Sequence, residues 1–315
     1  MRQPRTRVLY IGGLGRSGST LLDRIAGELP GATSAGELVH LWQRGVVEGQ
    51  LCACGEAFHD CPFWEKVGAE AFGSWDAPEV AEAMRLQREV DRNRYLPYLA
   101  VPPPSGAYRS RLERYGELLG ALYGAISSVA GGAVVVDSSK HASTALVLHR
   151  TPSISLRMVH LVRDARGTAY SWTKHVRRPE VPDREVLMHQ HAPWRTAARF
   201  DGYNAMLHAL RLAGVPTLFM RYEDLVAAPR AQVERLALFA GLDGGDALDF
   251  VGPSSVRLGM PHSVSGNPMR FSVGTIDVRL DDEWRARLPR RDRLTVTAVA
   301  APLLAAYGYL RPRSG

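Results

Sequence analysis

This 315-residue chain has little lysine, no long apolar run and few cysteines. Only three of its 39 basic residues are lysine, and the arginines are interleaved with Asp and Glu. That distribution disfavours a nucleic-acid-binding stripe, which gathers basic residues on one element. The net charge of +7 instead fits a basic pocket for a small polyanion. No apolar run approaches the roughly 20 residues of a membrane span, and the first one is too short for a signal peptide. We therefore expect a cytoplasmic protein with no nucleic-acid or membrane partner.

All three cysteines lie in one segment, at Cys52, Cys54 and Cys61. An odd number of cysteines in a chain without a secretory signal does not suggest a disulfide scaffold. With His59 the segment could offer four ligands to zinc, but its Cys-x-Cys spacing is tighter than the usual two-residue gap. The sequence therefore favours buried thiols, or a disulfide within the segment, and predicts no metal site.

The most informative stretch is a glycine-rich loop, GGLGRSGST at positions 12–20, which follows the apolar run at 8–11. It is predicted to join a strand to a helix. Glycines let the backbone fold closely around a phosphate, and the helix dipole favours negative charge. From Gly13 the spacing is that of a Walker A loop, with Ser19 in place of the lysine. The motif predicts a phosphate site without the usual triphosphatase chemistry, although a glycine-rich turn with no ligand stays open.

Three further apolar runs, at 133–136, 156–162 and 216–220, also end in polar residues. Continuous apolar strands separated by helices are typical of a parallel sheet covered on both faces. Ligands bind beyond the carboxyl ends of such strands. The sequence therefore predicts one α/β domain over residues 1–315. A mostly helical, cysteine-containing segment at 45–110 is expected to be inserted within it as a cap over the sheet edge.

Two separated motifs resemble those of the sulfotransferases that use 3′-phosphoadenosine 5′-phosphosulfate (PAPS). GRSGSTLL at 15–22 resembles their 5′-phosphosulfate loop, and LVRDARGTAYSW at 161–172 resembles their 3′-phosphate motif. GNPMRF at 266–271 resembles a nucleotide-facing segment of bacterial members. The resemblance implies a P-loop-like sulfotransferase fold and a donor-binding site. The residues implied for that site are Gly15, Arg16, Ser17, Gly18, Ser19, Thr20, Leu21, Arg163, Ser171, Tyr222, Asn267 and Arg270.

A sulfonate donor needs no Mg²⁺ clamp, so the missing Walker lysine is expected and no metal is required. Arg16, loop amides and hydroxyls can hold the 5′-phosphate as it gains charge. Arg163 can fork to the 3′-phosphate, with Ser171 as a second donor. Lys140 follows a buried strand, and a lysine at a comparable strand end in the family lies near the bridging oxygen between sulfur and phosphate. The resemblance implies the same catalytic role here.

Glu37 is the expected general base, because transfer to a hydroxyl needs a group that takes its proton. It lies 21 residues after the arginine of the loop and resembles the catalytic glutamate of the branch that sulfates protein tyrosines. Cytosolic members instead use a histidine two residues beyond the strand-end lysine, where this chain has Ala142. His40 and His141 stay as alternatives, although His141 is expected to point elsewhere.

The sequence thus predicts in-line transfer of a sulfuryl group from PAPS to an acceptor hydroxyl. A hydroxylated secondary metabolite or phenol is the favoured acceptor, because the Arg-, Ala- and Gly-rich composition suggests a GC-rich bacterium. A carbohydrate or a peptide tyrosine stays open. The segment at 45–110 and the loop at 176–194 are expected to shape the acceptor site.

Two other functions stay open. A P-loop kinase for a small molecule would use Thr20 and Asp137 as Mg²⁺ ligands, although Ser19 in place of the Walker lysine disfavours it. A non-catalytic nucleotide-binding regulator would bind the donor without turning it over. Glu37 and Lys140 both facing the nucleotide would count against the regulator.

Overall fold

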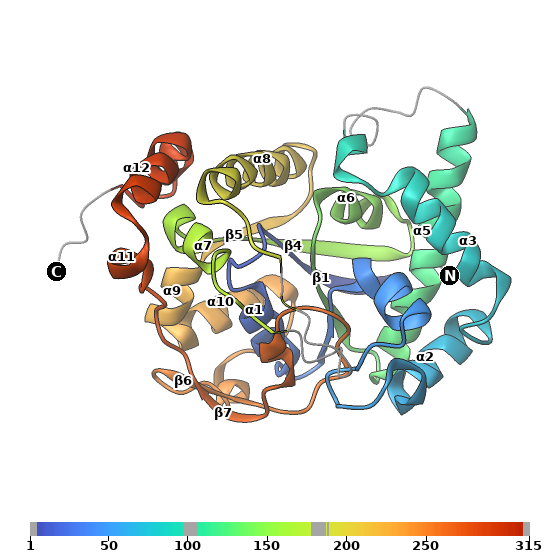
Figure 1. Cartoon of the computed structure of the whole chain (residues 1–315). Helices are drawn as coiled ribbons and strands as arrows, with labels where there is room; N and C mark the ends of the chain where they lie inside the picture. Colours follow the sequence, from blue (N-terminus) through green and yellow to red (C-terminus); the bar gives the residue numbers. More distant parts are fainter. Residues whose placement is uncertain (1–4, 97–105, 178–186, 188, 311–315) are drawn as a thin grey trace.

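The structure is a computed structural model that describes residues 5–96, 106–177, 187 and 189–310. Its centre is a sheet of five parallel strands, in the spatial order β2-β3-β1-β4-β5 (Figure 1). These strands are β1 (Thr6–Gly12), β2 (Ala32–Gly36), β3 (Val134–Lys140), β4 (Ile154–Val162) and β5 (Thr217–Arg221). Two further strands, β6 (Ser255–Leu258) and β7 (Gly274–Asp277), form a separate antiparallel ribbon.

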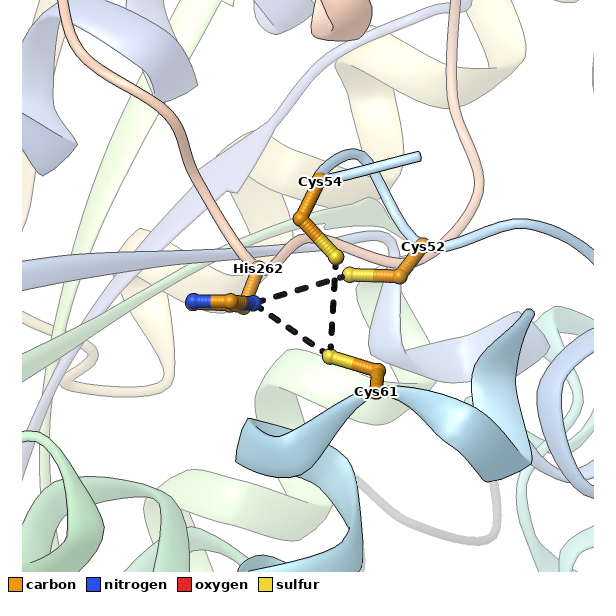
Figure 2. A group of neighbouring side chains, drawn as sticks. All are labelled: Cys52, Cys54, Cys61 and His262. Carbon is orange, nitrogen blue, oxygen red and sulfur yellow. Dashed lines mark hydrogen bonds between the residues drawn. The ribbon is translucent and has the colours of Figure 1, made fainter. Parts of the chain in front are cut away.

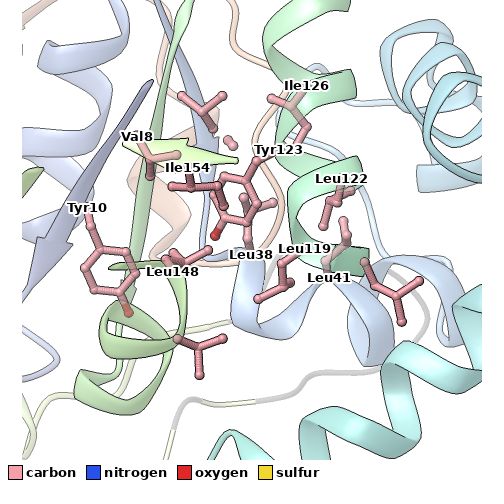
Figure 3. Close-up of a cluster of buried hydrophobic side chains, with 14 of the residues drawn as sticks. Val8, Tyr10, Leu38, Leu41, Leu119, Leu122, Tyr123, Ile126, Leu148 and Ile154 are labelled. Carbon is pink, nitrogen blue, oxygen red and sulfur yellow. The ribbon is translucent and has the colours of Figure 1, made fainter. Parts of the chain in front are cut away.

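Helices cover both faces of the sheet, because alternate residues of β1 pack into two different hydrophobic clusters. Val8 and Tyr10 pack with α5, as Figure 3 shows, whereas Leu9 and Ile11 pack with α1 and α10. The helices are α1 (Ser19–Gly27), α2 (Pro62–Phe72), α3 (Pro78–Val90), α5 (Gly106–Val129), α6 (Ala142–Arg150), α7 (Ala165–Ser171), α8 (Pro193–Leu212), α9 (Tyr222–Ala227), α10 (Pro229–Ala240), α11 (Trp284–Arg287), α12 (Arg290–Val299) and α13 (Ala301–Ala306). The predicted parallel α/β sheet is confirmed.

The sequence predicted four strands and missed β2, whose sequence ATSAG contains no run of large apolar residues. A short edge strand of small residues carries almost no hydrophobic signal. The predicted strand at 133–136 is too short, because β3 continues as strand through Asp137 to Lys140. That extension places Lys140 at the very end of a central strand.

The part of the predicted insertion that the structure describes covers residues 45–96 and 106–110. It contains the end of a π-helical segment (Leu41–Val47), α2, α3 and the start of α5. Its large side chains, such as Phe58 and Trp64, belong to the same cluster as Val8 of β1. These helices therefore pack on the main core and build none of their own.

Candidate active site

A cavity of about 780 Å³ lies at the carboxyl ends of the central strands. Parallel strands place their carboxyl ends at one edge of the sheet, so residues far apart in the sequence meet there. All but two of the predicted site residues line this cavity. Those that line it are Gly15, Arg16, Gly18, Ser19, Thr20, Leu21, Glu37, Lys140, Arg163, Ser171, Tyr222 and Asn267.

The glycine loop forms one wall of the cavity and leads into α1. Gly18 precedes this helix with φ 91°, in the left-handed region, and a Cβ there would lie 2.5 Å from Cδ2 of Tyr222. No side chain caps the N-terminus of α1. The first N–H groups of a helix have no partner within it, so this uncapped end supplies donors for an anion.

Arg16 projects from the same loop. It has φ 71°, a strained conformation for a residue other than glycine. Its guanidinium carbon lies 5.3 Å from the centre of the Trp172 ring. The Trp172 indole in turn donates a 3.0 Å hydrogen bond to the carbonyl of Gly15. Burial lowers the pKa of Arg16 although the charge of Glu37 opposes that shift. The loop therefore holds a half-buried positive charge beside the uncapped helix.

Lys140 and Glu37 form an ion pair in the cavity wall. The Nζ of Lys140 lies 2.6 Å from Oε1 of Glu37 and donates a 2.9 Å hydrogen bond to the carbonyl of Ser138. Lys140 also has φ 71°. Burial alone would raise the pKa of Glu37, but the charge of Lys140 and its hydrogen bond outweigh burial and hold that pKa below 4.5. Glu37 is therefore a carboxylate at neutral pH.

Arg163 directly follows β4 on the other side of the loop. Its Nη2 lies 3.1 Å from Oδ2 of Asp281 and donates a 2.8 Å hydrogen bond to the Asp281 carbonyl. Its guanidinium carbon lies 4.8 Å from the centre of the Tyr222 ring. Arg163 is only 6% exposed, so these contacts fix its direction. The cavity thus has a second cationic position, and Ser171 also lines its wall.

Both alternative bases also line the cavity. His40 Nε2 lies 3.6 Å from Oε2 of Glu37, and burial lowers the pKa of His40 to about 3. His40 is therefore neutral at physiological pH. The expectation that His141 points elsewhere is wrong, because it lines the cavity with its ring 6.2 Å from that of His40. Burial lowers the pKa of His141 as well.

Two predicted site residues do not line the cavity. Ser17 is 2% exposed, and its backbone N–H donates to the carbonyl of Leu14. Arg270 is buried and donates to the carbonyls of Ser263 and Leu51, at 2.9 and 2.8 Å. The structure thus corrects the prediction for Arg270, which ties two loops together behind the cavity. The sequence could not distinguish a structural arginine from a ligand-binding one, because a guanidinium donates hydrogen bonds to carbonyls as well as to phosphates.

Sequence reasoning missed several lining residues. Arg199, Tyr203 and Met206 of α8 also line the cavity. Their i, i+4, i+7 spacing places them on one helix face, which is a signal that periodicity could have found. Leu14, Trp172, Gly266 and Met269 also line the cavity and lie within motifs quoted above, although they were not predicted as site residues. Arg44, Asn93 and Asp281 are lining residues at single positions without a pattern.

Asp137, the second Mg²⁺ ligand that a kinase would need, lies outside the cavity. It is fully buried, and its carboxylate accepts hydrogen bonds from the Ser139 N–H and hydroxyl and from the Tyr123 hydroxyl. Burial raises the pKa of Asp137 to about 6. The Asp137 oxygens thus already have partners in the core. They cannot form, together with Thr20, the Mg²⁺ site that a kinase would need.

A sequence model described as the sulfotransferase family matches residues 9–246 of this chain. The chain belongs to the sulfotransferase family. Mouse carbohydrate sulfotransferase 4 is 35% identical over 105 residues, which cover 29% of this chain and 27% of the mouse protein. The aligned region is therefore only about a quarter of that relative's length.

Solved sulfotransferase structures share the fold. The sulfotransferase domain of the Synechococcus PCC 7002 olefin synthase superposes with a TM-score of 0.52 at 20% identity, covering 99% of this chain and 98% of that domain. The sulfotransferase domain of the curacin biosynthetic pathway gives the same TM-score at 17% identity, covering 96% and 98%. At these identities the similarity establishes the fold, and the predicted sulfotransferase fold is confirmed. Among the residues that the structure describes, no helix is both long and apolar enough to cross a bilayer.

Proposed function

We propose that this sulfotransferase moves a sulfuryl group from PAPS to the hydroxyl of a small acceptor. The observation that carries the proposal is the placement of three cations, Arg16, Lys140 and Arg163, around one cavity. They follow three neighbouring strands, β1, β3 and β4. A donor with phosphates on the 3′ and 5′ oxygens of one ribose needs two separate anion sites. The uncapped α1 and Arg163 supply donors of the required kind at two positions.

Different residues of the chain bind the two phosphates. Arg16, the hydroxyls of Ser19 and Thr20 and the first amides of α1 bind the 5′-phosphate. Arg163 and Ser171 bind the 3′-phosphate, and Tyr222 and Asn267 line the cavity where the nucleoside would lie. When bound, the donor supplies a sulfuryl group on a phosphate that leaves with added negative charge. No Mg²⁺ is needed for this transfer.

Lys140 and Glu37 act on the reacting atoms. As the acceptor oxygen forms its bond to sulfur, the bond between sulfur and the bridging oxygen breaks, and Lys140 and Arg16 stabilise the charge on the departing phosphate. Glu37 takes the proton of the acceptor hydroxyl. Because Lys140 holds the pKa of Glu37 down, a shift of the ammonium toward the leaving phosphate would raise that pKa. Loss of the ion pair during the transfer thus makes Glu37 more basic when it must accept a proton.

The acceptor is proposed to bind between α8 and the inserted segment. Tyr203 and Met206 provide aromatic and soft apolar contacts there, and Arg199 provides a positive charge. Asn93, which belongs to the inserted segment, lines the cavity. This supports the role of the inserted segment as a cap. Residues 178–186 and 188 of the predicted loop at 176–194 lie outside the described residues. A small hydroxylated ring compound fits these side chains. We propose that the transfer takes place in the bacterial cytoplasm.

The test is transfer of sulfur-35 from labelled PAPS to a panel of phenols and sugars in buffer without Mg²⁺. We expect a labelled sulfate ester together with an equal amount of 3′-phosphoadenosine 5′-phosphate. Lys140→Ala should lower kcat by about 10²–10³-fold, the usual loss for one group that stabilises developing charge. Lys66→Ala, on the exposed side of α2, is the matched control. Phosphoryl transfer from Mg-ATP, or full activity of Lys140→Ala, would contradict the proposal.

A further inference from the structure

Three cysteines and one histidine converge outside the active-site cavity. The ligand atoms of Cys52, Cys54, Cys61 and His262 all lie within 4.8 Å of one another, and Figure 2 shows their side chains pointing to a common centre. From the sequence, His59 was the candidate for the fourth ligand. That assignment is wrong, because Nε2 of His59 lies 2.9 Å from the carbonyl of Val46. His262 comes from a segment 201 residues beyond Cys61.

Three of the separations are close to those around one tetrahedral zinc ion. Bonds of about 2.3 Å to sulfur and 2.0–2.1 Å to nitrogen place two sulfurs about 3.8 Å apart, and a sulfur and a nitrogen about 3.6 Å apart. The Cys54 and Cys61 sulfurs are 3.7 Å apart. Nδ1 of His262 lies 3.9 Å from the sulfur of Cys52 and 3.3 Å from that of Cys61. The cysteines are unbridged.

The local structure orients these ligands. A turn at Gly55, with φ 97°, brings Cys52 and Cys54 to the same side, and the Gly55 N–H donates to the Cys52 carbonyl at 3.0 Å. Cys61 precedes α2 and is fully buried. The ring of Phe63, on the first turn of α2, stacks on His262 with centroids 5.0 Å apart and an angle of 8°. Such packing holds the imidazole in one orientation.

We infer that Cys52, Cys54, Cys61 and His262 bind one structural Zn²⁺. Thiolate-rich sets favour zinc over hard cations, and four protein ligands leave no position open for a substrate, which is typical of a structural site. Cys52 and Cys61 are both 0% exposed, so an ion here would be shielded from solvent. The ion would thus act on the structure and take no part in the transfer chemistry.

The ion would join the inserted segment to the backbone that positions Glu37. The N–H of Ala53 donates to the Ser263 carbonyl at 3.0 Å, beside His262. Val264 then pairs with the strand end before Glu37, since the Val264 carbonyl accepts from the Glu37 N–H at 2.9 Å. Asn267 follows in the same segment and lines the cavity. Zinc would therefore stiffen one wall of the active site without touching the substrates.

Metal analysis of the full-length chain, purified without an affinity tag from zinc-supplemented medium, tests this inference. We expect about one zinc per chain by plasma mass spectrometry. After exchange for Co²⁺, we expect the visible absorption bands of a tetrahedral, thiolate-rich site. His262→Ala and Cys54→Ser should each weaken Zn²⁺ binding by more than about 100-fold, since even outer-shell changes cost 10–100-fold. His59→Ala is the matched control and should keep its zinc.

Thiol reactivity of the wild-type chain provides a second measurement that does not depend on how the variants fold. With zinc bound, the three thiols should resist a thiol reagent, and a strong chelator should make them reactive. A wild-type chain that neither contains zinc nor binds added Zn²⁺ would overturn the inference. So would loss of two hydrogens by mass spectrometry, which indicates a disulfide, or loss of zinc in His59→Ala. These readouts require no transfer activity, so they stand apart from the proposed function.

Discussion

Replacing Glu37 by glutamine separates proton removal from donor binding. The substitution keeps the shape of the side chain but removes its negative charge, which faces Nζ of Lys140 at 2.6 Å. Loss of a general base lowers kcat by about 10²–10⁴-fold, or roughly 3–5 kcal/mol of transition-state free energy. Lys140 keeps its charge and loses the carboxylate that competes for it. We therefore expect affinity for 3′-phosphoadenosine 5′-phosphate to stay equal or increase while kcat falls.

The pH profile sharpens this prediction. Glu37 must be deprotonated to act as a base, and its pKa lies below 4.5. The wild-type rate should therefore hold as pH falls from 8 to 5, with no loss near the ordinary histidine value of 6.5. The assay is the initial rate of bisphosphate release across this pH range, measured alongside calorimetric titration of the product. Glu65→Gln, on the exposed side of α2, is the matched control.

A loss of no more than about twofold in Glu37→Gln would refute the assignment, since removal of a general base costs far more. The base would then be sought at His40 or His141. His40 has a pKa of about 3, so it too would leave the rate flat over the same pH range. Only the substitutions His40→Ala and His141→Ala would distinguish them.

Three further predictions concern the loop, the second cation and the core. Gly18→Ala should weaken bisphosphate binding in calorimetry by more than about tenfold, because its Cβ would meet Tyr222 at 2.5 Å; Gly131→Ala, also at positive φ but in open space, should bind normally. Asp281→Asn removes the carboxylate that pairs with Arg163 at 3.1 Å and should tighten binding by about two- to fivefold; weaker binding would contradict this. Burial raises the pKa of Asp23 to about 7, above its unfolded value of 3.8. Between these two values the folded state binds a proton that the unfolded state releases, so the stability of the fold falls as pH rises from 4 to 7. Asp23→Asn should flatten that slope in urea unfolding, by at most about 4 kcal/mol over the range, and an unchanged slope would exclude Asp23 as its source.

The sequence predicted the strand-end residues well because parallel strands bring their carboxyl ends together. Lys140 and Arg163 each follow an apolar run, so the topology alone places both at one edge. The glycine loop was also predictable from the sequence, since Gly18 needs a conformation that few other residues adopt. In these cases the local pattern and the global fold impose the same position.

The rest depended on contacts that no local pattern encodes. Arg270 looks like a ligand-binding arginine in its motif, yet it serves the carbonyls of Ser263 and Leu51. His262 joins cysteines some 200 residues away through the pairing of its segment with the end of β2. Its neighbours in the sequence give no sign of a metal ligand, so only the folded chain shows the cluster.

Binding of the donor's product distinguishes a PAPS site from a site for a nucleoside triphosphate. Wild-type protein and Arg163→Ala would be titrated in a calorimeter with 3′-phosphoadenosine 5′-phosphate, and separately with ATP and Mg²⁺. Arg257→Ala, on the exposed face of β6, is the matched control. The account predicts that the bisphosphate binds without metal, that Arg163→Ala abolishes this binding, and that Arg257→Ala retains it. Binding of Mg-ATP alone, or equal bisphosphate affinity in Arg163→Ala, would contradict a PAPS-dependent transfer at this site.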